Sequence, residues 1–328
     1  MADDSATPSP DRATRWWRLR RAEVEARADA TVKEIQAQFE ATKHQFEAAN
    51  EVIEARTGRN LIAAIVIGLA LGLTVMFSLI FMKELFMVFT TIVVAFGSFE
   101  LATALRIAGY RVPRVAIVLV SIATIPAAFY LSDEGKWLVL LGGAVVIAVW
   151  RLVESAIPRW RATGRRLWED LAAGSFVLVY VPFLAGFAVL LAAKPGGEWW
   201  TLAAVITVVA TDTGAYASGL MFGKHPMAPK ISPKKTWEGF AGSVLSAVIA
   251  GVLLAILMLG QPWWVGVVFG LVLCSTATLG DLTESLIKRD LGVKDMSSWL
   301  PGHGGFLDRL DSILPSSAAA YILFVIVV

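Results

Sequence analysis

Long apolar runs separated by short polar segments dominate the chain from residue 59 onwards. A transmembrane helix needs roughly 20 apolar residues to cross about 30 Å of hydrocarbon. Nine runs reach or approach that length: 60–82, 84–106, 114–132, 137–153, 171–193, 199–221, 238–259, 264–287 and 312–328. The third, fourth and ninth runs are short, and a tight turn at Lys83-Glu84 separates the first two. The pattern predicts an all-α fold, a polytopic membrane helical bundle with nine transmembrane helices, over residues 59–328.

The N-terminal part is polar and shows two different patterns. Residues 1–15 lack an apolar core followed by a cleavage site, so we predict a disordered cytoplasmic tail over 1–19 and no cleavable signal. Over 20–58, apolar positions recur in steps of three and four, at Val32, Ile35, Phe39, Thr42, Phe46, Ala49 and Ile53. This spacing predicts an amphipathic, coiled-coil type cytoplasmic helix. Such a helix either dimerises or binds the membrane surface, or it lies alone against the rest of the protein.

Composition agrees with a membrane protein and excludes several other classes. The chain has 328 residues, of which 56% are hydrophobic and 17% charged, and its mean hydropathy is +0.65. These values are too apolar for a soluble domain of this size. The net charge of +2 does not favour nucleic acid as a partner. The single cysteine, Cys274, excludes an intrachain disulfide and argues against a zinc site.

The positions of the basic residues predict the orientation of the bundle. With the N-terminus inside, the inside loops carry sixteen Lys and Arg residues and the outside loops carry three; the other ten of the 29 lie in the N-terminal region. Positive charge collects on the cytoplasmic side of membrane proteins, so the count supports nine spans, N-in and C-out. We therefore expect a multi-pass protein of the cell (inner or plasma) membrane whose charged C-terminal stretch faces the cytoplasm.

That stretch, Ser285–Asp311, is the most charged part of an otherwise apolar second half. Lysines and arginines alternate in it with four aspartates, and glycines flank His303. Carboxylates bind Mg²⁺, Lys and Arg bind phosphate oxygens, and glycine lets main-chain N–H groups approach an anion closely. The composition suits a metal-bound polyphosphate. The alternative is a solvated, charged loop between two membrane helices.

The end of the eighth run carries four polar residues on one helical face. Asp281, Glu284, Ser285 and Lys288 follow one another at i, i+3, i+4 and i+7. A carboxylate at membrane depth is costly unless it is paired or bound to metal, so Asp281 is a candidate functional residue. For Glu284 a role in the site and a neutralising pair with Lys288 stay equally open.

Asp308 and Asp311 are three residues apart near the start of the last helix, where they could face the same ion as Asp281. Arg309 between them is placed to face phosphate. His303 is either a phosphate contact, an acid or base, or a residue that fixes the loop. Asp290 and Asp295 are open between loop folding and indirect support of the site.

Residues 224–239 form a second basic patch with Pro-containing turns. Ser232, Lys234, Lys235 and Thr236 precede a predicted helix, and hydroxyls, lysines and a helix N-terminus together make an anion site. The patch contains no Walker-type glycine loop, which excludes a P-loop ATPase. The alternative interpretation is positive charge that only marks the cytoplasmic side.

Asp212 interrupts the sixth apolar run and shares a helical face with Tyr216. An ionisable residue at this depth is expected to face the interior of the bundle, so Asp212 is a candidate for the active-site cavity, against a structural hydrogen bond. Glu100 in the second run is similar but has no supporting motif, and no role is assigned to it.

These motifs resemble the phosphatidate cytidylyltransferase (CDP-diacylglycerol synthase) family. The family pattern is matched by Ser285, Leu286, Ile287, Lys288-Arg289, Lys294-Asp295, His303-Gly304-Gly305, Asp308-Arg309 and Asp311, by Ser232–Gly239, and by the segment from Asp212 to Tyr216. The resemblance implies an enzyme of phospholipid biosynthesis, a nucleotidyltransferase that transfers CMP from CTP to phosphatidic acid and releases pyrophosphate.

The resemblance also implies roles for residues. It implies Mg²⁺ dependence, with Asp281, Asp308 and Asp311 as metal ligands, and it leaves open whether a second cation such as K⁺ assists. The predicted catalytic residues are Asp212, Asp281, Lys288, Arg289 and His303, and the predicted substrate-binding residues are Ser232, Lys234, Lys235, Thr236, Ser285 and Arg309. From the coil and the resemblance we expect a homodimer in the lipid bilayer.

Three other functions are alternatives to this one. A polyprenol or other lipid kinase, or another lipid nucleotidyltransferase, would have a similar charged cytoplasmic face. An ion-coupled transporter would use the buried Asp212 and Asp281 to carry ions. A scaffold built on the N-terminal coil would leave the acidic and basic motif unexplained.

Overall fold

The structure is a computed structural model that describes Glu40 and residues 61–158, 162, 164–293, 296–297, 299 and 304–328, with side chains from residue 68 onwards in the first helix. The chain divides into two units, Met1–Ala64 and Ile65–Val328. The predicted tail over 1–19, and the predicted helix over 20–58 apart from Glu40, lie outside the described residues. The homodimer expected from that helix therefore stays a prediction.

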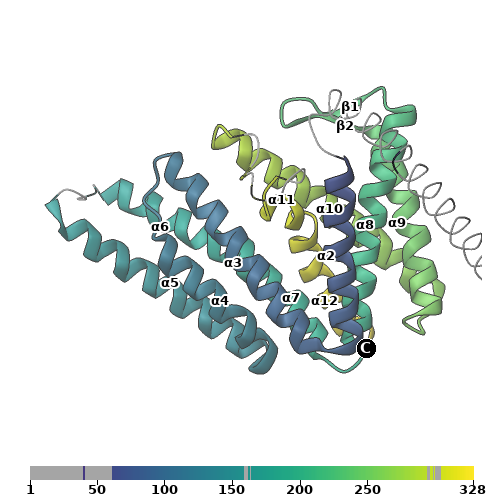
Figure 1. The fold of residues 1–328 in the computed structure, drawn as a ribbon, viewed down its shortest axis with the longest axis horizontal. Coiled ribbons are helices and arrows are strands. Elements are labelled where there is room, and N and C mark those ends of the chain that lie inside the picture. The colour runs from purple at the N-terminus through teal and green to yellow at the C-terminus, as the bar shows by residue number, and fades with distance from the viewer. Residues whose placement is uncertain are drawn as a thin grey trace, which may run out of the picture. The chain divides into compact units, whose positions relative to one another are not determined.

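The second unit is helical and carries one small β-hairpin (Figure 1). Its elements, in chain order, are α2 (Leu61–Phe81), α3 (Lys83–Ile107), α4 (Arg114–Tyr130), α5 (Ser132–Ala156), α6 (Gly164–Leu178), the π-helical turn η2 (Val179–Phe183), α7 (Leu184–Ala193), α8 (Gly197–Phe222), β1 (Pro226–Ala228), β2 (Ser232–Thr236), α9 (Trp237–Leu257), α10 (Trp263–Asp290), α11 (Leu307–Leu310) and α12 (Ile313–Val327). Strands β1 and β2 pair antiparallel.

Seven helical segments in the described part of the chain are long and apolar enough to cross a membrane, judged by length and composition. They are Lys83–Ile107, Ser132–Ala156, Gly164–Ala193, Gly197–Phe222, Trp237–Leu257, Trp263–Asp290 and Leu307–Val327. Two shorter apolar helices, Gly68–Phe81 and Arg114–Tyr130, accompany them. Apart from the small hairpin, the described part of the chain is thus a helical, polytopic membrane bundle, as the apolar runs predicted.

The helices of this unit form two groups that meet along α7 and α12. Helix α4 packs on α3 and α5, and α5 packs on α6, whereas α9 packs between α8 and α10. Helix α12 contacts α7 on one side and α10 on the other, so it connects the groups (Figure 1). The connection matters for the site, because the last acidic motif lies at the start of α12.

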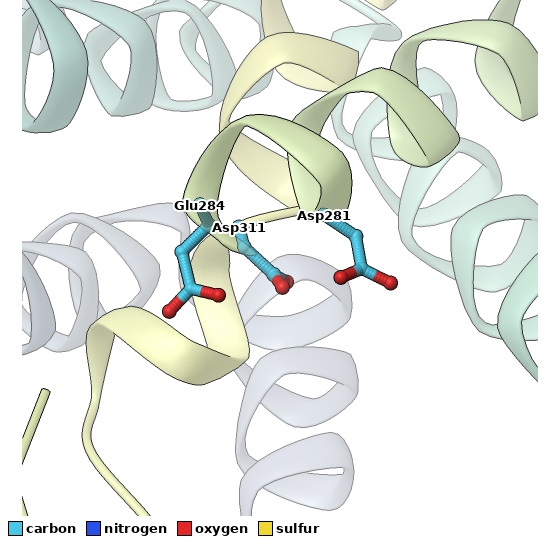
Figure 2. Close-up of side chains that lie close together, drawn as sticks. All are labelled: Asp281, Glu284 and Asp311. Carbon is cyan, nitrogen blue, oxygen red and sulfur yellow. The ribbon is translucent and has the colours of Figure 1, made fainter. Parts of the chain in front are cut away.

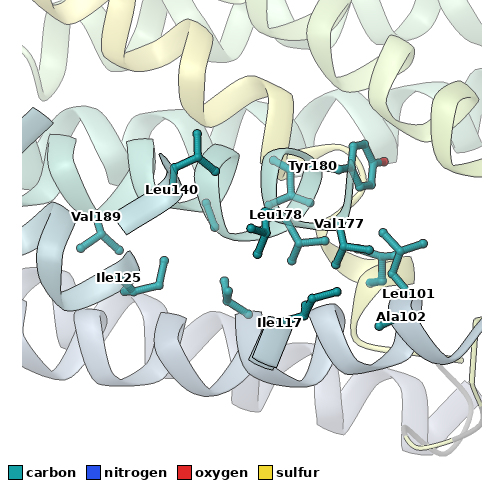
Figure 3. Close-up of a cluster of buried hydrophobic side chains, with 14 of the residues drawn as sticks. Leu101, Ala102, Ile117, Ile125, Leu140, Val177, Leu178, Tyr180 and Val189 are labelled. Carbon is teal, nitrogen blue, oxygen red and sulfur yellow. The ribbon is translucent and has the colours of Figure 1, made fainter. Parts of the chain in front are cut away.

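The larger hydrophobic core fills the space between α3, α4, α5 and the α6–α7 segment. Figure 3 shows side chains from these helices in contact, and the labelled ones are Leu101, Ala102, Ile117, Ile125, Leu140, Val177, Leu178, Tyr180 and Val189. Pro182 lies inside the turn η2, which interrupts the segment between α6 and α7. Proline cannot donate a main-chain hydrogen bond, and π-turns are often found at functional sites.

Two helices begin earlier than the apolar pattern predicts, because a helix can start in polar sequence that a hydropathy count leaves out. The fourth run was predicted to begin at residue 137, but α5 begins at Ser132 and has Asp133 and Glu134 in its first turn. Acidic side chains stabilise a helix N-terminus, so the helix extends into residues that an apolar count rejects. The fifth run was predicted over 171–193, and its helix begins earlier, at Gly164, in polar sequence whose first turn carries no acidic residue.

Candidate active site

One face of α10 supplies the polar residues of the site. The helix is continuous to Asp290, so Asp281, Glu284, Ser285 and Lys288 stack along it as the spacing predicted. Glu284 has only 1% of its side chain exposed, whereas Asp281 is partly accessible. The hydroxyl of Ser285 donates to Asp281 Oδ1 at 3.4 Å.

A glycine lets α10 approach the α11–α12 junction closely. A methyl group on Gly280 would overlap the main-chain carbonyl of Asp311 and would lie 2.7 Å from Pro315 Cγ. Since glycine has no side chain, the Asp311 carboxylate can lie beside the two acidic residues that follow Gly280. Figure 2 shows the carboxyl groups of Asp281, Glu284 and Asp311 turned toward one another from these two elements.

These three residues form the carboxylate cluster, and they fit a divalent cation. Each offers one oxygen, and the three oxygens lie within 4.8 Å of one another. Among the described residues, Glu284 Oε1 is buried without a hydrogen-bond partner. Three carboxylates so close repel one another unless a positive charge lies between them, and carboxylate oxygens are the ligands that Mg²⁺ prefers. The donor set and the unpaired oxygen are both accounted for by a bound cation.

Lysines neutralise the edges of the carboxylate cluster. Lys235 Nζ lies 2.5 Å from Asp281 Oδ2, and Lys288 Nζ lies 2.6 Å from Glu284 Oε2 and 3.2 Å from Asp308 Oδ1. Asp308 therefore lies with Lys288, and Glu284 stands in the close group where the sequence placed Asp308. The Glu284–Lys288 pair that was considered as a helix-stabilising alternative is present, and it adjoins the carboxylate cluster.

The loop before α12 is folded by its own carboxylate and by a distant one. Asp308 Oδ2 accepts from the main-chain N–H of Gly305 at 2.8 Å, and Gly304 has a positive φ of 81° that glycine adopts without strain. Glu100, which is 2% exposed, accepts from Phe306 N at 3.0 Å and from Leu307 N at 2.9 Å. A side chain on Gly305 would clash with Glu100, so both glycines serve the fold of the loop.

Glu100 is expected to act as a positioning residue. Its carboxylate also accepts from Ser297 Oγ at 2.5 Å, so it holds both ends of the loop that carries Asp308. Glu100→Gln has one acceptor oxygen instead of two, and we expect faster amide hydrogen exchange at residues 304–307 and a roughly tenfold lower turnover. Glu134→Gln, at an exposed residue of α5, is the matched control. Unchanged exchange in the variant would contradict this role.

The basic patch folds as the β1–β2 hairpin beside the end of α10. Arg289 Nε donates to the carbonyl of Ile231 at 3.3 Å, and Lys235 on β2 reaches Asp281. Thr236 Oγ1 accepts from Gly239 N at 3.1 Å, so this hydroxyl caps the N-terminus of α9. The remaining two predicted anion-binding residues also lie on β2, where Ser232 is half-buried and Lys234 is exposed.

Asp212 belongs to the same charged region, although its side chain is exposed and not enclosed among helices. It interacts electrostatically with Asp281, Lys235 and Arg309. Tyr216, which the sequence placed on the same helical face, is 71% exposed. The structure thus brings Asp212 near the carboxylate cluster and keeps it accessible.

Two residues to which the sequence assigned no role lie at the site. One predicted catalytic residue lies outside the described residues. Glu100 was left unassigned, and Tyr180 was not considered. The buried hydroxyl of Tyr180 interacts electrostatically with the three residues of the carboxylate cluster and has no hydrogen-bond partner among the described residues. Pro182, two residues after Tyr180, is the one feature of the sequence that could have drawn attention to this turn. His303, with Lys294 and Asp295, lies outside the described residues.

Comparisons with known proteins match the part of the chain that contains the helices and the candidate site. The model of the cytidylyltransferase family matches residues 62–327. Phosphatidate cytidylyltransferases of Mycobacterium bovis and Mycobacterium leprae are each 39% identical to this chain over 274 residues, which is 82% and 81% of this chain and 90% and 88% of those proteins. Phosphatidate cytidylyltransferase 4, chloroplastic, of Arabidopsis thaliana is 35% identical over 235 residues, which is 64% of this chain and 57% of that protein.

Proposed function

We propose a mechanism for this site on the premise that the chain belongs to the cytidylyltransferase family. It is a phosphatidate cytidylyltransferase, which transfers CMP from CTP to phosphatidate and gives CDP-diacylglycerol and pyrophosphate. The observation that supports our assignment of the site is the convergence of three carboxylates from α10 and the α11–α12 junction between Lys235 and Lys288.

The reaction needs two anions to meet and needs little proton transfer. An oxygen of the phosphatidate phosphate attacks the α-phosphorus of CTP, the bond from that phosphorus to the bridging oxygen breaks, and pyrophosphate leaves. The nucleophile is already charged, so no strong base is required. The protein has to orient the two substrates and offset the negative charge that collects in the transition state.

We assign the carboxylate cluster of Asp281, Glu284 and Asp311 to a divalent cation. When bound, Mg²⁺ would supply positive charge to the triphosphate. Lys288 offsets one of the two negative charges of Glu284 and Asp308, which lowers the repulsion that CTP would meet at the acidic region. The sequence suggested Asp281, Asp308 and Asp311 as ligands, and our proposed set has Glu284 in place of Asp308.

The remaining basic residues are assigned to phosphate. Lys235 is close enough to the carboxylate cluster to contact an anion bound there, and Arg309 and Lys234 extend the positive surface. Arg289 holds the hairpin to the end of α10, which fixes the position of Lys235. The role of His303 as a phosphate contact or as an acid or base stays a prediction.

Metal removal and substrate exchange test this function together. With the purified protein in detergent, pyrophosphate release is expected only when CTP, phosphatidate and Mg²⁺ are all present. A chelator should reduce the rate to background, and added Mg²⁺ should restore it, because the carboxylate cluster would again hold its cation. ATP with a polyprenol or diacylglycerol is the comparison for a lipid kinase. Phosphorylation of those lipids without CMP transfer would contradict the proposal.

We also propose that the nine apolar helices all span the membrane, N-in and C-out, with the site at the cytoplasmic face. Two ion contacts support this arrangement. Lys83, from a loop predicted to be outside, donates to the carbonyl of Lys194 at 3.3 Å and to Glu198 at 2.7 Å, so two predicted outside loops meet. The hairpin and α10, predicted to be inside at their contact, meet through Lys235.

Cysteine labelling tests this orientation. Cys274 is buried, so it provides a low background for a membrane-impermeant maleimide. In intact cells Glu134→Cys, on the predicted outside, should be labelled and Lys230→Cys in the hairpin should not, whereas both should react after permeabilisation. Labelling of Lys230→Cys in intact cells would show that the hairpin lies outside and would contradict the proposed orientation.

A further inference from the structure

An apolar cavity of about 90 Å³ lies among α2, α3, α7, α8 and α12. At one end it is lined by Val94, Ala185, Val208 and Leu310. At the other end it is lined by Phe86 and Leu191. None of its lining residues is charged, so it is separate in chemistry from the carboxylate cluster.

The first of these ends lies next to the site. Leu310 directly precedes Asp311, and Val208 precedes Asp212 by four residues on α8. One turn of a helix rises about 5.4 Å, so the apolar lining begins about one turn from carboxylates of the charged region. A molecule bound to the site by a charged headgroup could therefore extend an apolar chain directly into the cavity.

The cavity runs away from the site along the helix axes. On α3 its lining extends from Val94 to Phe86, and on α12 and its preceding turn from Leu310 to Ala320. At 1.5 Å per residue these segments span about 12 and 15 Å. Half of the roughly 30 Å hydrocarbon core is about 15 Å. The lining thus extends over nearly the depth of one leaflet, which is the depth that a lipid acyl chain occupies.

Three of the four hydroxyl groups in the lining donate to carbonyls of their own helices, and Thr90 carries the fourth. The hydroxyl groups of Thr201, Ser316 and Ser317 donate to main-chain carbonyls four residues earlier, at 2.7–2.9 Å. A cavity whose lining offers so few available polar partners is poorly suited to water and well suited to hydrocarbon. We propose that this cavity binds one acyl chain of phosphatidate while its phosphate lies beside Lys235 and the carboxylate cluster.

The size of the cavity sets what it can hold. About 10–15 Å³ of such volume accommodates one water-sized group, so this cavity takes roughly six to nine methylene groups. That is a large part of one acyl chain of phosphatidate, and it leaves the second chain to the bilayer. The inference rests on the proposed function, since it assigns the chain of the lipid whose phosphate reacts.

Two variants change the cavity in opposite directions. Ala204→Leu, midway along the stretch of α8 that lines the cavity, fills it, and excluding about two methylene groups should raise KM for dipalmitoyl phosphatidate about tenfold with little change for the dibutanoyl lipid, whose chains are too short to fill the cavity. Phe86→Ala opens the far end of the cavity and should raise kcat/KM, relative to wild type, for the phosphatidates with the longest acyl chains. Ala123→Leu is the same substitution at an exposed alanine of α4, and it should leave the chain-length profile unchanged.

A binding measurement separates this inference from the function. Phosphatidate with a diazirine in one acyl chain, irradiated without CTP, should label α8 and α12 next to Ala204 and Ala320, and Ala204→Leu should lose this label. Labels confined to exposed residues such as Leu253 of α9, with a wild-type chain-length profile in both variants, would overturn the inference alone. Absence of CMP transfer to phosphatidate of any length would overturn the proposed function and the inference with it.

Discussion

Asp281→Asn is expected to reduce turnover by about a thousandfold while the protein stays folded in the membrane. The substitution keeps the shape of the side chain and removes one of the three charges that converge at the carboxylate cluster. A metal ion supplies several kcal/mol of charge stabilisation in a transition state, and about 4 kcal/mol corresponds to a factor of a thousand in rate. The measurement is pyrophosphate release from CTP and phosphatidate, together with Mn²⁺ binding followed by EPR without nucleotide.

A matched control exists on the same helix. Asp290 is exposed at the end of α10, and Asp290→Asn removes a charge of the same kind outside the carboxylate cluster. We expect this variant to bind Mn²⁺ and to turn over at close to the wild-type rate. Normal turnover and normal metal binding in Asp281→Asn would show that the carboxylate cluster does not hold the catalytic ion.

What the sequence predicts well at this site is what local helix geometry determines. The spacing of Asp281, Glu284 and Lys288 places them on one face whatever the tertiary structure, because a helix repeats every 3.6 residues. Their distance from Asp311 depends on how closely α10 approaches the α11–α12 junction. Gly280 permits that approach, and a single glycine in an apolar run does not reveal its partner.

The spacing of residues in the sequence could not show whether Glu284 or Asp308 is the third member of the carboxylate cluster. Both residues are acidic and both adjoin predicted site residues, but the direction of the loop before α11 decides whether Asp308 turns to Asp311 or to Lys288 and the N–H of Gly305. That direction is fixed by Glu100, which is about 200 residues away in the chain and holds the N–H groups of Phe306 and Leu307. Contacts at this separation come from the tertiary packing of α3, and no local pattern encodes them.

The membrane domain was predictable to a similar extent and for similar reasons. Apolar runs located the helices, since hydrocarbon demands apolar length, but they missed polar helix starts such as Ser132. They also gave no sign of the β1–β2 hairpin, whose short strands lie in a basic sequence that was interpreted as turns. Charge and hydropathy indicate where a segment lies in the bilayer, whereas hairpins and helix ends depend on individual capping and pairing contacts.

Lys288→Met is expected to lower stability more than any surface substitution, and to abolish activity as well. Lys288 Nζ lies between Glu284 Oε2 at 2.6 Å and Asp308 Oδ1 at 3.2 Å, and both carboxylates are largely buried. Removing one member of a buried pair leaves an uncompensated charge, at a cost of about 3–5 kcal/mol. Thermal unfolding in detergent should show a clear fall in midpoint, and Lys224→Met, at an exposed lysine, should show none.

The double variant Glu284→Gln with Lys288→Met distinguishes charge from packing. A neutral amide at position 284 no longer needs the ammonium group, whereas Asp308 still lacks it, so the double variant should recover part of the stability that Lys288→Met loses. It should nevertheless stay inactive, because one ligand of the carboxylate cluster and one compensating charge are both missing. If the double variant is as unstable as Lys288→Met, the loss comes from the unpaired Asp308 carboxylate or from the aliphatic stem of the lysine, and the Glu284–Lys288 pair contributes little. Recovery of stability without activity would mean that the acidic residues are kept for the metal and the nucleotide, and that the lysine makes their burial tolerable.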